Sequence, residues 1–158
     1  TISGASTTIS SISGSYKHLQ IVLSGLYDSS GDSYYMRLNG DSGTNYWWNG
    51  YYSRDDNGTV GLVTYNSGRN GNTRANIMYQ NGSGDQNQRK GRGVINIYRY
   101  TDTNGVFFEL DTNNQDSIRS FSEHIGGVYN NSSAITSVTI GIISGTITSG
   151  TAYIYGVN

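Results

Sequence analysis

The sequence predicts an all-β protein, an antiparallel β-sandwich of the jelly-roll type with about 8 to 10 strands in one domain. Residues that favour helices are scarce among the 158, with four Ala, six Leu, two Lys and two Glu. Residues of strands and turns are abundant instead, since the chain holds 14 Tyr and 22 Gly but no Pro. Short alternating segments recur about every ten to fifteen residues between Gly-, Asn- and Asp-rich turns, as expected of a sandwich or barrel.

The first 13 residues are expected to lie outside this domain, which would span residues 14–158. They are small and polar, and their only large apolar side chains are Ile2, Ile9 and Ile12. Three isoleucines cannot form a core by themselves. The segment is therefore interpreted as a flexible linker or as an extended assembly arm whose isoleucines lie on a neighbouring subunit.

The next two segments alternate as strands do when one face lies on the core. In the first, YKHLQIVLSGL, the apolar positions are 19, 21 and 23. In the second, SYYMRLN, positions 34, 36 and 38 share one face. The turn DSSGDS separates them, so the pattern predicts two strands that pair with each other.

Seven further segments are predicted as strands: TNYWWNGYY, TVGLVTY, RANIMYQ, GVINIYRY, VFFEL, AITSVTIGII and TAYIYGV. The residues between them, such as DDNG and NNQD, are predicted as turns. Only residues 114–125 could hold a helical turn. No internal repeat of about 20 to 50 residues is visible, which argues against a propeller or a solenoid.

Charge and composition exclude several partners. The net charge is −1 and charged residues make up 13% of the chain, so no nucleic-acid or membrane-surface partner is expected. The single basic cluster, Arg89, Lys90 and Arg92, is interpreted as a solvated turn, or alternatively as a contact to phosphate or an anionic glycan. There is no Cys, no apolar run of about 18 residues and no charged-then-apolar leader, so neither a thiol site, a membrane span nor a signal peptide is expected.

The chain offers few groups for catalysis. Its two histidines are His18, inside a predicted strand, and His124, which follows Glu123 and so points to the opposite face of a strand. The carboxylates that could pair in glycoside hydrolysis are Asp41, Asp55, Asp56, Glu109 and Asp111. All but Glu109 lie in or beside predicted turns. We therefore expect no enzyme, no catalytic residue and no cofactor.

Calcium is the one metal that the turns suggest, because DDNG at 55–58 and DTNNQD at 111–116 carry oxygen ligands. Neither segment matches a complete calcium loop. Turns without a metal are therefore expected.

The aromatic run at 46–52 is the most informative stretch. If it is a strand, Tyr46 and Trp48 share one face and Trp47 points to the other. The rings at Trp47, Trp48, Tyr51 and Tyr52 are the candidate contact residues, and three interpretations stay open: a sugar-stacking platform, a protein interface, or core packing. We expect at least two of these four rings to be exposed in the isolated domain and buried against a protein neighbour in an assembly.

Four fragments in order along the chain resemble a β-sandwich domain of tailed-bacteriophage virion proteins, of the tail-fibre or capsid-surface type. They are GSYKHL (14–19), LNGDSGTNY (38–46), AITSVTI (134–140) and SGTAYIYGV (149–157). Residues 60–130 match no such pattern. In this resemblance residues 39–43 would form a turn with positive φ at its two glycines.

The resemblance implies a function and a location. Members are non-enzymatic and commonly oligomeric, so the expectation is a protein of the virion surface that assembles as a homo-oligomer, a trimer being favoured, with other virion proteins. The alternative is a glycan-binding adsorption module of a tail fibre or an extracellular lectin that contacts a host-surface glycan. A filament-forming surface protein is a further alternative.

Overall fold

A computed structural model describes residues 1–56, 59–66, 70–78, 89–115, 120–130 and 132–158. These residues contain no helix, and hence none that is long and apolar enough to cross a membrane. Within them lie eleven strands: β1 (Ser6–Ile9), β2 (His18–Asp28), β3 (Tyr34–Leu38), β4 (Tyr46–Asp56), β5 (Thr59–Asn66), β6 (Ala75–Met78), β7 (Arg89–Tyr98), β8 (Val106–Gln115), β9 (Ser120–Tyr129), β10 (Val138–Ile142) and β11 (Ile147–Val157).

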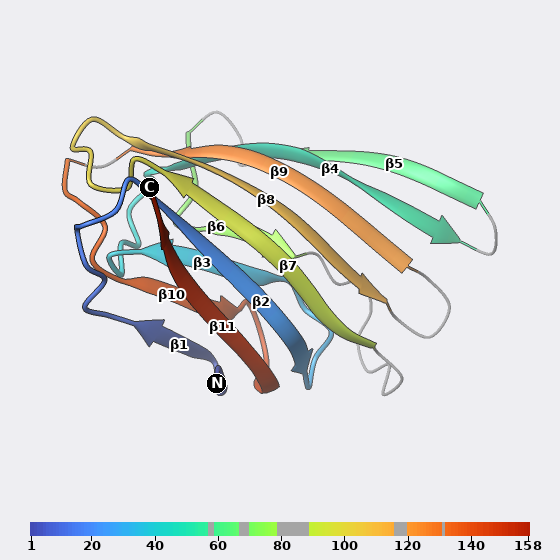
Figure 1. Cartoon of the computed structure of the whole chain (residues 1–158). Helices are drawn as coiled ribbons and strands as arrows, with labels where there is room; N and C mark the ends of the chain where they lie inside the picture. Colours follow the sequence, from blue (N-terminus) through green and yellow to red (C-terminus); the bar gives the residue numbers. More distant parts are fainter. Residues whose placement is uncertain (57–58, 67–69, 79–88, 116–119, 131) are drawn as a thin grey trace.

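The strands form two antiparallel sheets that face each other (Figure 1). One has seven strands in the order β11-β2-β7-β8-β9-β4-β5, and the other has four in the order β1-β10-β3-β6. The predicted all-β sandwich is therefore confirmed, although the described residues hold eleven strands rather than eight to ten. The jelly-roll type stays a prediction.

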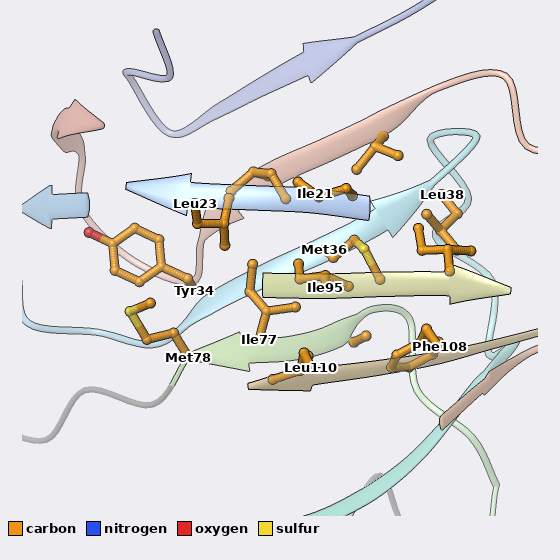
Figure 2. Packing of buried hydrophobic residues seen from close by; sticks show 14 of the residues in the cluster. Ile21, Leu23, Tyr34, Met36, Leu38, Ile77, Met78, Ile95, Phe108 and Leu110 are labelled. Atoms are coloured by element: carbon orange, nitrogen blue, oxygen red, sulfur yellow. The ribbon is translucent and has the colours of Figure 1, made fainter. Parts of the chain in front are cut away.

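The core lies between the two sheets and follows the predicted alternation. Leu19, Ile21 and Leu23 of β2 are buried, and every apolar position predicted for the inner face of β3 has no exposed surface. Figure 2 shows Ile21 and Leu23 of β2 and the inner side chains of β3 meeting those of β6, β7 and β8 between the layers. Burial of this continuous apolar layer is the main stabilising term of the fold.

The predicted pairing of the first two segments is wrong. β2 lies in the seven-stranded sheet between β11 and β7, whereas β3 lies in the other sheet between β10 and β6. The turn between them crosses from one layer to the other, and it is held by Asp28, which accepts hydrogen bonds from Ser30 N–H (2.8 Å) and the Tyr34 hydroxyl (3.0 Å). An alternating pattern identifies the buried face of a strand but not its partner.

Most of the predicted turn NNQD and part of the segment considered for a helical turn belong to strands instead. β8 runs on to Gln115, and β9 contains residues 120–125 of the segment 114–125 in which a helical turn was considered. The inner positions here include Thr112, Asn114 and Glu123, all buried. Because these core-facing residues are polar, the hydrophobic alternation that reveals a strand is missing.

The basic cluster also belongs to a strand, since β7 begins at Arg89. Lys90 and Arg92 are exposed, but the glycines beside them are needed for packing rather than for a turn. A Cβ at Gly91 would lie 2.6 Å from the sulfur of Met78, and one at Gly93 would clash with Thr112. The predicted turn at this cluster is therefore wrong.

The first 13 residues form part of the sandwich. β1 pairs with β10, Ile2 is buried in the core, and Ile2 N–H donates to Gly150 O at 2.9 Å. Ile12 packs on the core and Ile9 is half-buried. The structure thus shows an integral edge strand in place of a free arm, because these isoleucines find their apolar partners within their own chain.

The turn that follows β3 differs in detail from the expectation. Positive φ occurs at Asn39 (53°) and Gly40 (65°), whereas Gly43 is not among the residues with positive φ. Asn39 also joins this turn to a distant segment, since its side chain donates to Ala134 O (2.9 Å) and accepts from Thr136 N–H (2.8 Å).

Candidate functional site

The surface that could carry a function is the side of the seven-stranded sheet that faces away from the four-stranded sheet, here called the outer face. Pairing in register aligns its side chains in rows across the strands. One row consists of Trp47, Val128, Phe107, Tyr98, His18 and Val157. The next two rows are Asn49, Gly126, Glu109, Asn96, Gln20 and Tyr155, and Tyr51, His124, Asp111, Val94, Val22 and Tyr153.

Two of the four predicted contact rings do not reach this face. Trp48 and Tyr52 are buried, and Trp48 Nε1–H donates to Arg74 O at 3.2 Å. Tyr51 is 46% exposed and Trp47 is half-buried. Alternation along β4 sends Trp48 and Tyr52 into the core, so one ring is exposed and one is half-buried where at least two exposed rings were expected. Burial of the outward rings against a protein neighbour stays a prediction.

Other exposed rings were missed by the sequence analysis. Phe107 is 65% exposed, and Tyr153 and Tyr155 are each 50% exposed. The signal was present in the sequence, since Phe107 alternates with the buried Phe108 and each Tyr of β11 alternates with a smaller residue. A strand at the edge of a sheet can expose such a series of rings without loss of core.

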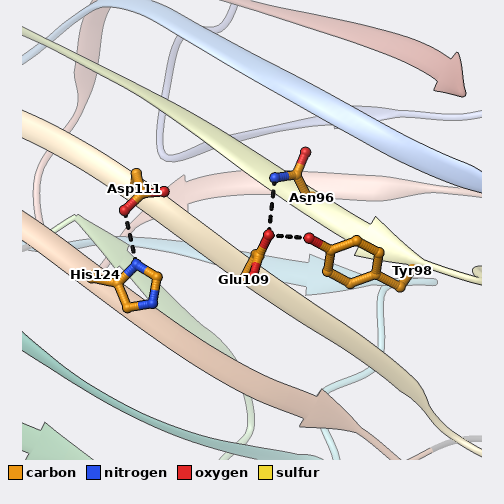
Figure 3. A network of polar contacts seen from close by, with 5 residues as sticks. All are labelled: Asn96, Tyr98, Glu109, Asp111 and His124. Carbon is orange, nitrogen blue, oxygen red and sulfur yellow. Dashed lines mark hydrogen bonds and ion pairs between the residues drawn. The ribbon is translucent and has the colours of Figure 1, made fainter.

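A polar network occupies the centre of the outer face (Figure 3). Oε1 of Glu109 accepts hydrogen bonds from the Tyr98 hydroxyl and from Asn96 Nδ2 (3.4 Å), and Gln20 Nε2 donates to Asn96 Oδ1 (3.1 Å). The bond to the Glu109 carboxylate raises the pKa of Tyr98 to about 12. No described donor reaches Oε2 of Glu109, so this oxygen can accept a hydrogen bond from a ligand.

His124 lies beside this network and is paired with a carboxylate. Its Nδ1 is 2.8 Å from Oδ1 of Asp111, and both side chains are well exposed. Its ring also contacts that of Tyr51, with centroids 5.6 Å apart. Glu123 points to the opposite side of β9, as predicted, and the partner of His124 comes from β8.

The outer face has an opening at Gly126. This residue lies between Asn49 of β4 and Glu109 of β8 in the register, and a Cβ built on it would meet no atom within 4 Å. Along β9 its neighbours on the same face are His124 and Val128. The opening is therefore surrounded by side chains on all four sides.

The free side of β11 forms a second feature, here called the β11 flank: Tyr153, Tyr155 and Val157. The two tyrosine rings are stacked, with centroids 6.5 Å apart and planes at 22°. Residues 2 and 4 bind the beginning of β11, and Lys17 N–H donates to Val157 O at the end. From Thr151 to Gly156 the described chain supplies no further backbone partner on this side.

Two polar hollows lie near the ends of the strands. Lys90 and Arg92 line one of them together with Asn113 and Ser122, and the other lies among Asn45, Asn104 and Asn130. The described residues bring no three His, Cys, Asp or Glu side chains together as a metal site. The DDNG segment extends into residues 57–58, which lie outside the described residues.

Comparison with known proteins identifies no family. No protein-family model and no curated protein matches the chain. A Bacteroides ovatus protein of unknown function superposes with a TM-score of 0.32 and 9% identity, over 69% of this chain and 45% of that one. Ail, the attachment invasion locus protein of Yersinia pestis, superposes with a TM-score of 0.23 and 6% identity, over 73% and 98%.

The chain thus spans less than half the length of the first of these proteins. A structure of infectious bursal disease virus, Gt strain, gives a TM-score of 0.16 with 12% identity, over 96% of this chain and 40% of that one. Likenesses as weak as these carry no argument about function.

Proposed function

We propose that this protein is a non-enzymatic component of the surface of a bacteriophage particle and that contacts with neighbouring protein subunits hold it there. It would decorate the head, form part of a fibre or belong to the tail, and it would act as a homo-oligomer, for which a trimer is the favoured number. The observation that carries this proposal is the β11 flank, an unpaired strand edge with exposed, stacked tyrosines.

The β11 flank has the chemistry of a protein interface. A free strand edge offers backbone donors and acceptors to a strand of a neighbour. Tyrosines are frequent anchors of protein interfaces because each buries a large area for little loss of side-chain entropy. The rings of Tyr153 and Tyr155 stand beside such an edge, so one neighbouring chain could use both features.

The fragments that resemble phage proteins also meet in space. LNGDSGTNY contacts AITSVTI through Asn39, which bonds to Ala134 and Thr136. GSYKHL contacts SGTAYIYGV, because Lys17 bonds to Val157 and the Tyr16 ring covers Gly156, where a Cβ would clash. The resemblance therefore falls on residues that hold one another in place, which supports treating it as a framework of the fold.

Purified particles provide the first test. Mass spectrometry of virions from the phage that encodes this chain should detect it in structural amounts, and immunogold labelling should place it on the surface. Light scattering of the purified protein should give a mass above that of one 17.2 kDa chain. Absence from purified particles would contradict the proposal.

Replacement of both tyrosines tests the β11 flank. The double variant Tyr153→Ser, Tyr155→Ser should weaken attachment or self-association at least thirtyfold, since an aromatic anchor contributes about 2 kcal/mol or more. Because both rings are exposed in the single chain, its thermal stability should change little. Ile143→Ser is the matched control, because it removes an exposed apolar side chain just after β10, outside the β11 flank. If only the control variant loses attachment, the contact is not at β11.

A further inference from the structure

Gly126 is a glycine for which neither the backbone nor the packing of the chain gives a reason. Glycine in a strand weakens it, and it is usually kept where φ is positive or where another group approaches closely. Its neighbour Gly127 has such a reason, since a Cβ there would clash with Phe108. Gly126 has no positive φ and no atom within 4 Å of a built Cβ. Among the strand glycines whose surroundings the structure describes, it is the only one that lacks both reasons.

The opening above Gly126 has the size of a small ligand. Because neighbouring strands lie about 4.8 Å apart, the backbones of Asn49 and Glu109 are about 10 Å from each other across it. His124 and Val128, four residues apart on β9, stand about 13 Å from each other along the strand. The floor is the backbone of Gly126, so a ligand ring could approach the sheet more closely here than over any residue with a side chain.

The rim combines aromatic faces with hydrogen-bonding groups. Tyr51 and Phe107 stand at opposite corners of the opening. Tyr51 pairs with His124 and Phe107 pairs with Val128, and these two partners flank Gly126 on the outer face of β9. Both rings are exposed. Aromatic faces carry negative charge density and attract the C–H groups of a flat ligand. Between the rings, Asn49 and the available Oε2 of Glu109 can bind hydroxyl groups.

The charges around the opening select against anions. Glu109 stands on the rim, and Asp111 lies next to it on the same face of β8. His124 of β9 faces them and is paired with Asp111, while Asn96 and Tyr98 of β7 are uncharged amide and phenol groups. The positive side chain that β7 adds to this face, Arg92, pairs with Asn113 and lies two rows of the register away from Gly126. A phosphorylated or sialylated ligand would meet this negative field, whereas a neutral, hydroxylated ring would not.

We propose that the opening over Gly126 is a binding subsite for a neutral sugar. One pyranose ring would stack on Phe107 or Tyr51 and donate hydroxyl hydrogen bonds to Glu109 and Asn49. The subsite lies on β4, β8 and β9, apart from the β11 flank, and it does not depend on the proposed role in a particle.

Binding by the full chain is the first measurement. The protein should be tested on a glycan array that carries neutral oligosaccharides of glucose, galactose and N-acetylglucosamine together with sialylated and phosphorylated ones. Methyl glucoside, methyl galactoside and N-acetylglucosamine at millimolar concentration should then be tested by saturation-transfer NMR. At least one neutral sugar should bind, with no preference for the anionic ones.

Filling the opening provides the second measurement. Gly126→Val should lower the affinity for the bound neutral sugar at least tenfold, while the melting temperature stays equal or rises because valine favours strands. Phe107→Ala should lower the affinity as well. Ser24→Val is the matched control, since it adds the same side chain to the outer face of β2, outside the opening, and should leave sugar binding unchanged.

Three outcomes would overturn this proposal. They are a failure of every neutral sugar to bind, a preference for anionic glycans, and full binding by the folded Gly126→Val variant. Loss of particle attachment by Gly126→Val without any sugar binding would assign the opening to a protein neighbour instead. None of these outcomes concerns Tyr153 or Tyr155, so the proposal for the β11 flank is tested independently.

Discussion

At the residue scale, one carboxylate organises the connection between the two sheets. Asp41 accepts hydrogen bonds from Gly43 N–H (2.7 Å), Asn45 Nδ2 (2.8 Å) and the Tyr129 hydroxyl (3.1 Å). It thereby ties the turn after β3 to the ends of β4 and β9. Among the carboxylates considered for catalysis, its bonds indicate a structural role, because its donors all come from its own turn and the adjacent core.

The environment of Asp41 predicts an acid-sensitive stability. Partial burial by itself would raise the pKa of this carboxyl, but the hydrogen bonds from Asn45, Gly43 and Tyr129 outweigh it and hold the pKa below its ordinary value. A carboxyl with a lowered pKa stabilises the fold when ionised. This contribution is complete above the pKa of the unfolded chain, about 4, and is lost as the pH falls through the lower pKa of the folded state.

Asp41→Asn should therefore lower the free energy of unfolding by about 1 kcal/mol at pH 7, after allowance for solvent screening. The free energy of unfolding of this variant should also depend less on pH in the acid range. Thermal melts between pH 2 and pH 7 measure both effects. Asp102→Asn is the control, because Asp102 lies in an exposed ion pair with Arg99, and its effect should stay within about 0.5 kcal/mol. Equal losses in the two variants would contradict the structural role of Asp41.

At the element scale, the N-terminal segment closes one edge of the sandwich. β1 forms the edge of the four-stranded sheet, and residues 2 and 4 bind the beginning of β11 in the other sheet. The segment therefore joins both layers. Its deletion would remove an apolar core residue and a strand together, so it should destabilise the domain instead of affecting assembly alone.

Ile2→Ala should lower the free energy of unfolding by about 2 to 5 kcal/mol, as expected when a fully buried isoleucine leaves a cavity. Ile9→Ala is the comparison, and the half-buried side chain should cost clearly less. Urea unfolding of the three proteins gives the values. An unchanged stability of the Ile2 variant would mean that the segment is the free arm that its composition suggests.

At the scale of the whole molecule, the two sheets share one core. Ile21 and Ile95 of the seven-stranded sheet and Met36 and Ile77 of the other sheet are all without exposed surface and belong to one cluster. Each sheet shields the apolar inner face of the other from water. The domain should therefore unfold in a single cooperative step.

Met36→Ala tests this cooperativity. The change lies in the four-stranded sheet, whereas Trp47 and Trp48 lie on β4 of the seven-stranded sheet. Loss of the buried methionine should cost about 2 to 5 kcal/mol and should shift the unfolding seen by tryptophan fluorescence and by far-ultraviolet dichroism equally. A fluorescence transition that keeps its wild-type midpoint would show that the sheets unfold separately.

The sequence by itself determined the fold class and, for most strands, the buried face. Alternation is a local property, so the inner positions of β2 and β3, and the inward direction of Tyr46 and Trp48, could be predicted without knowledge of any partner. Scarcity of helix formers was sufficient to predict a chain whose described residues hold no helix. The strand at β9 was missed because its inward positions include Glu123, whose burial depends on neighbours from other strands.

Only the tertiary structure decided which strands pair, and the candidate site depends on that pairing. No local sequence feature determines that β2 pairs with β7 and not with β3. Strand pairing depends on long-range contacts throughout the core. The opening at Gly126 exists because Asn49 and Glu109, 60 positions apart in the sequence, align with it across two strand pairs. A glycine in a sequence indicates only that a side chain is absent, and its neighbours in space decide whether that absence makes a site.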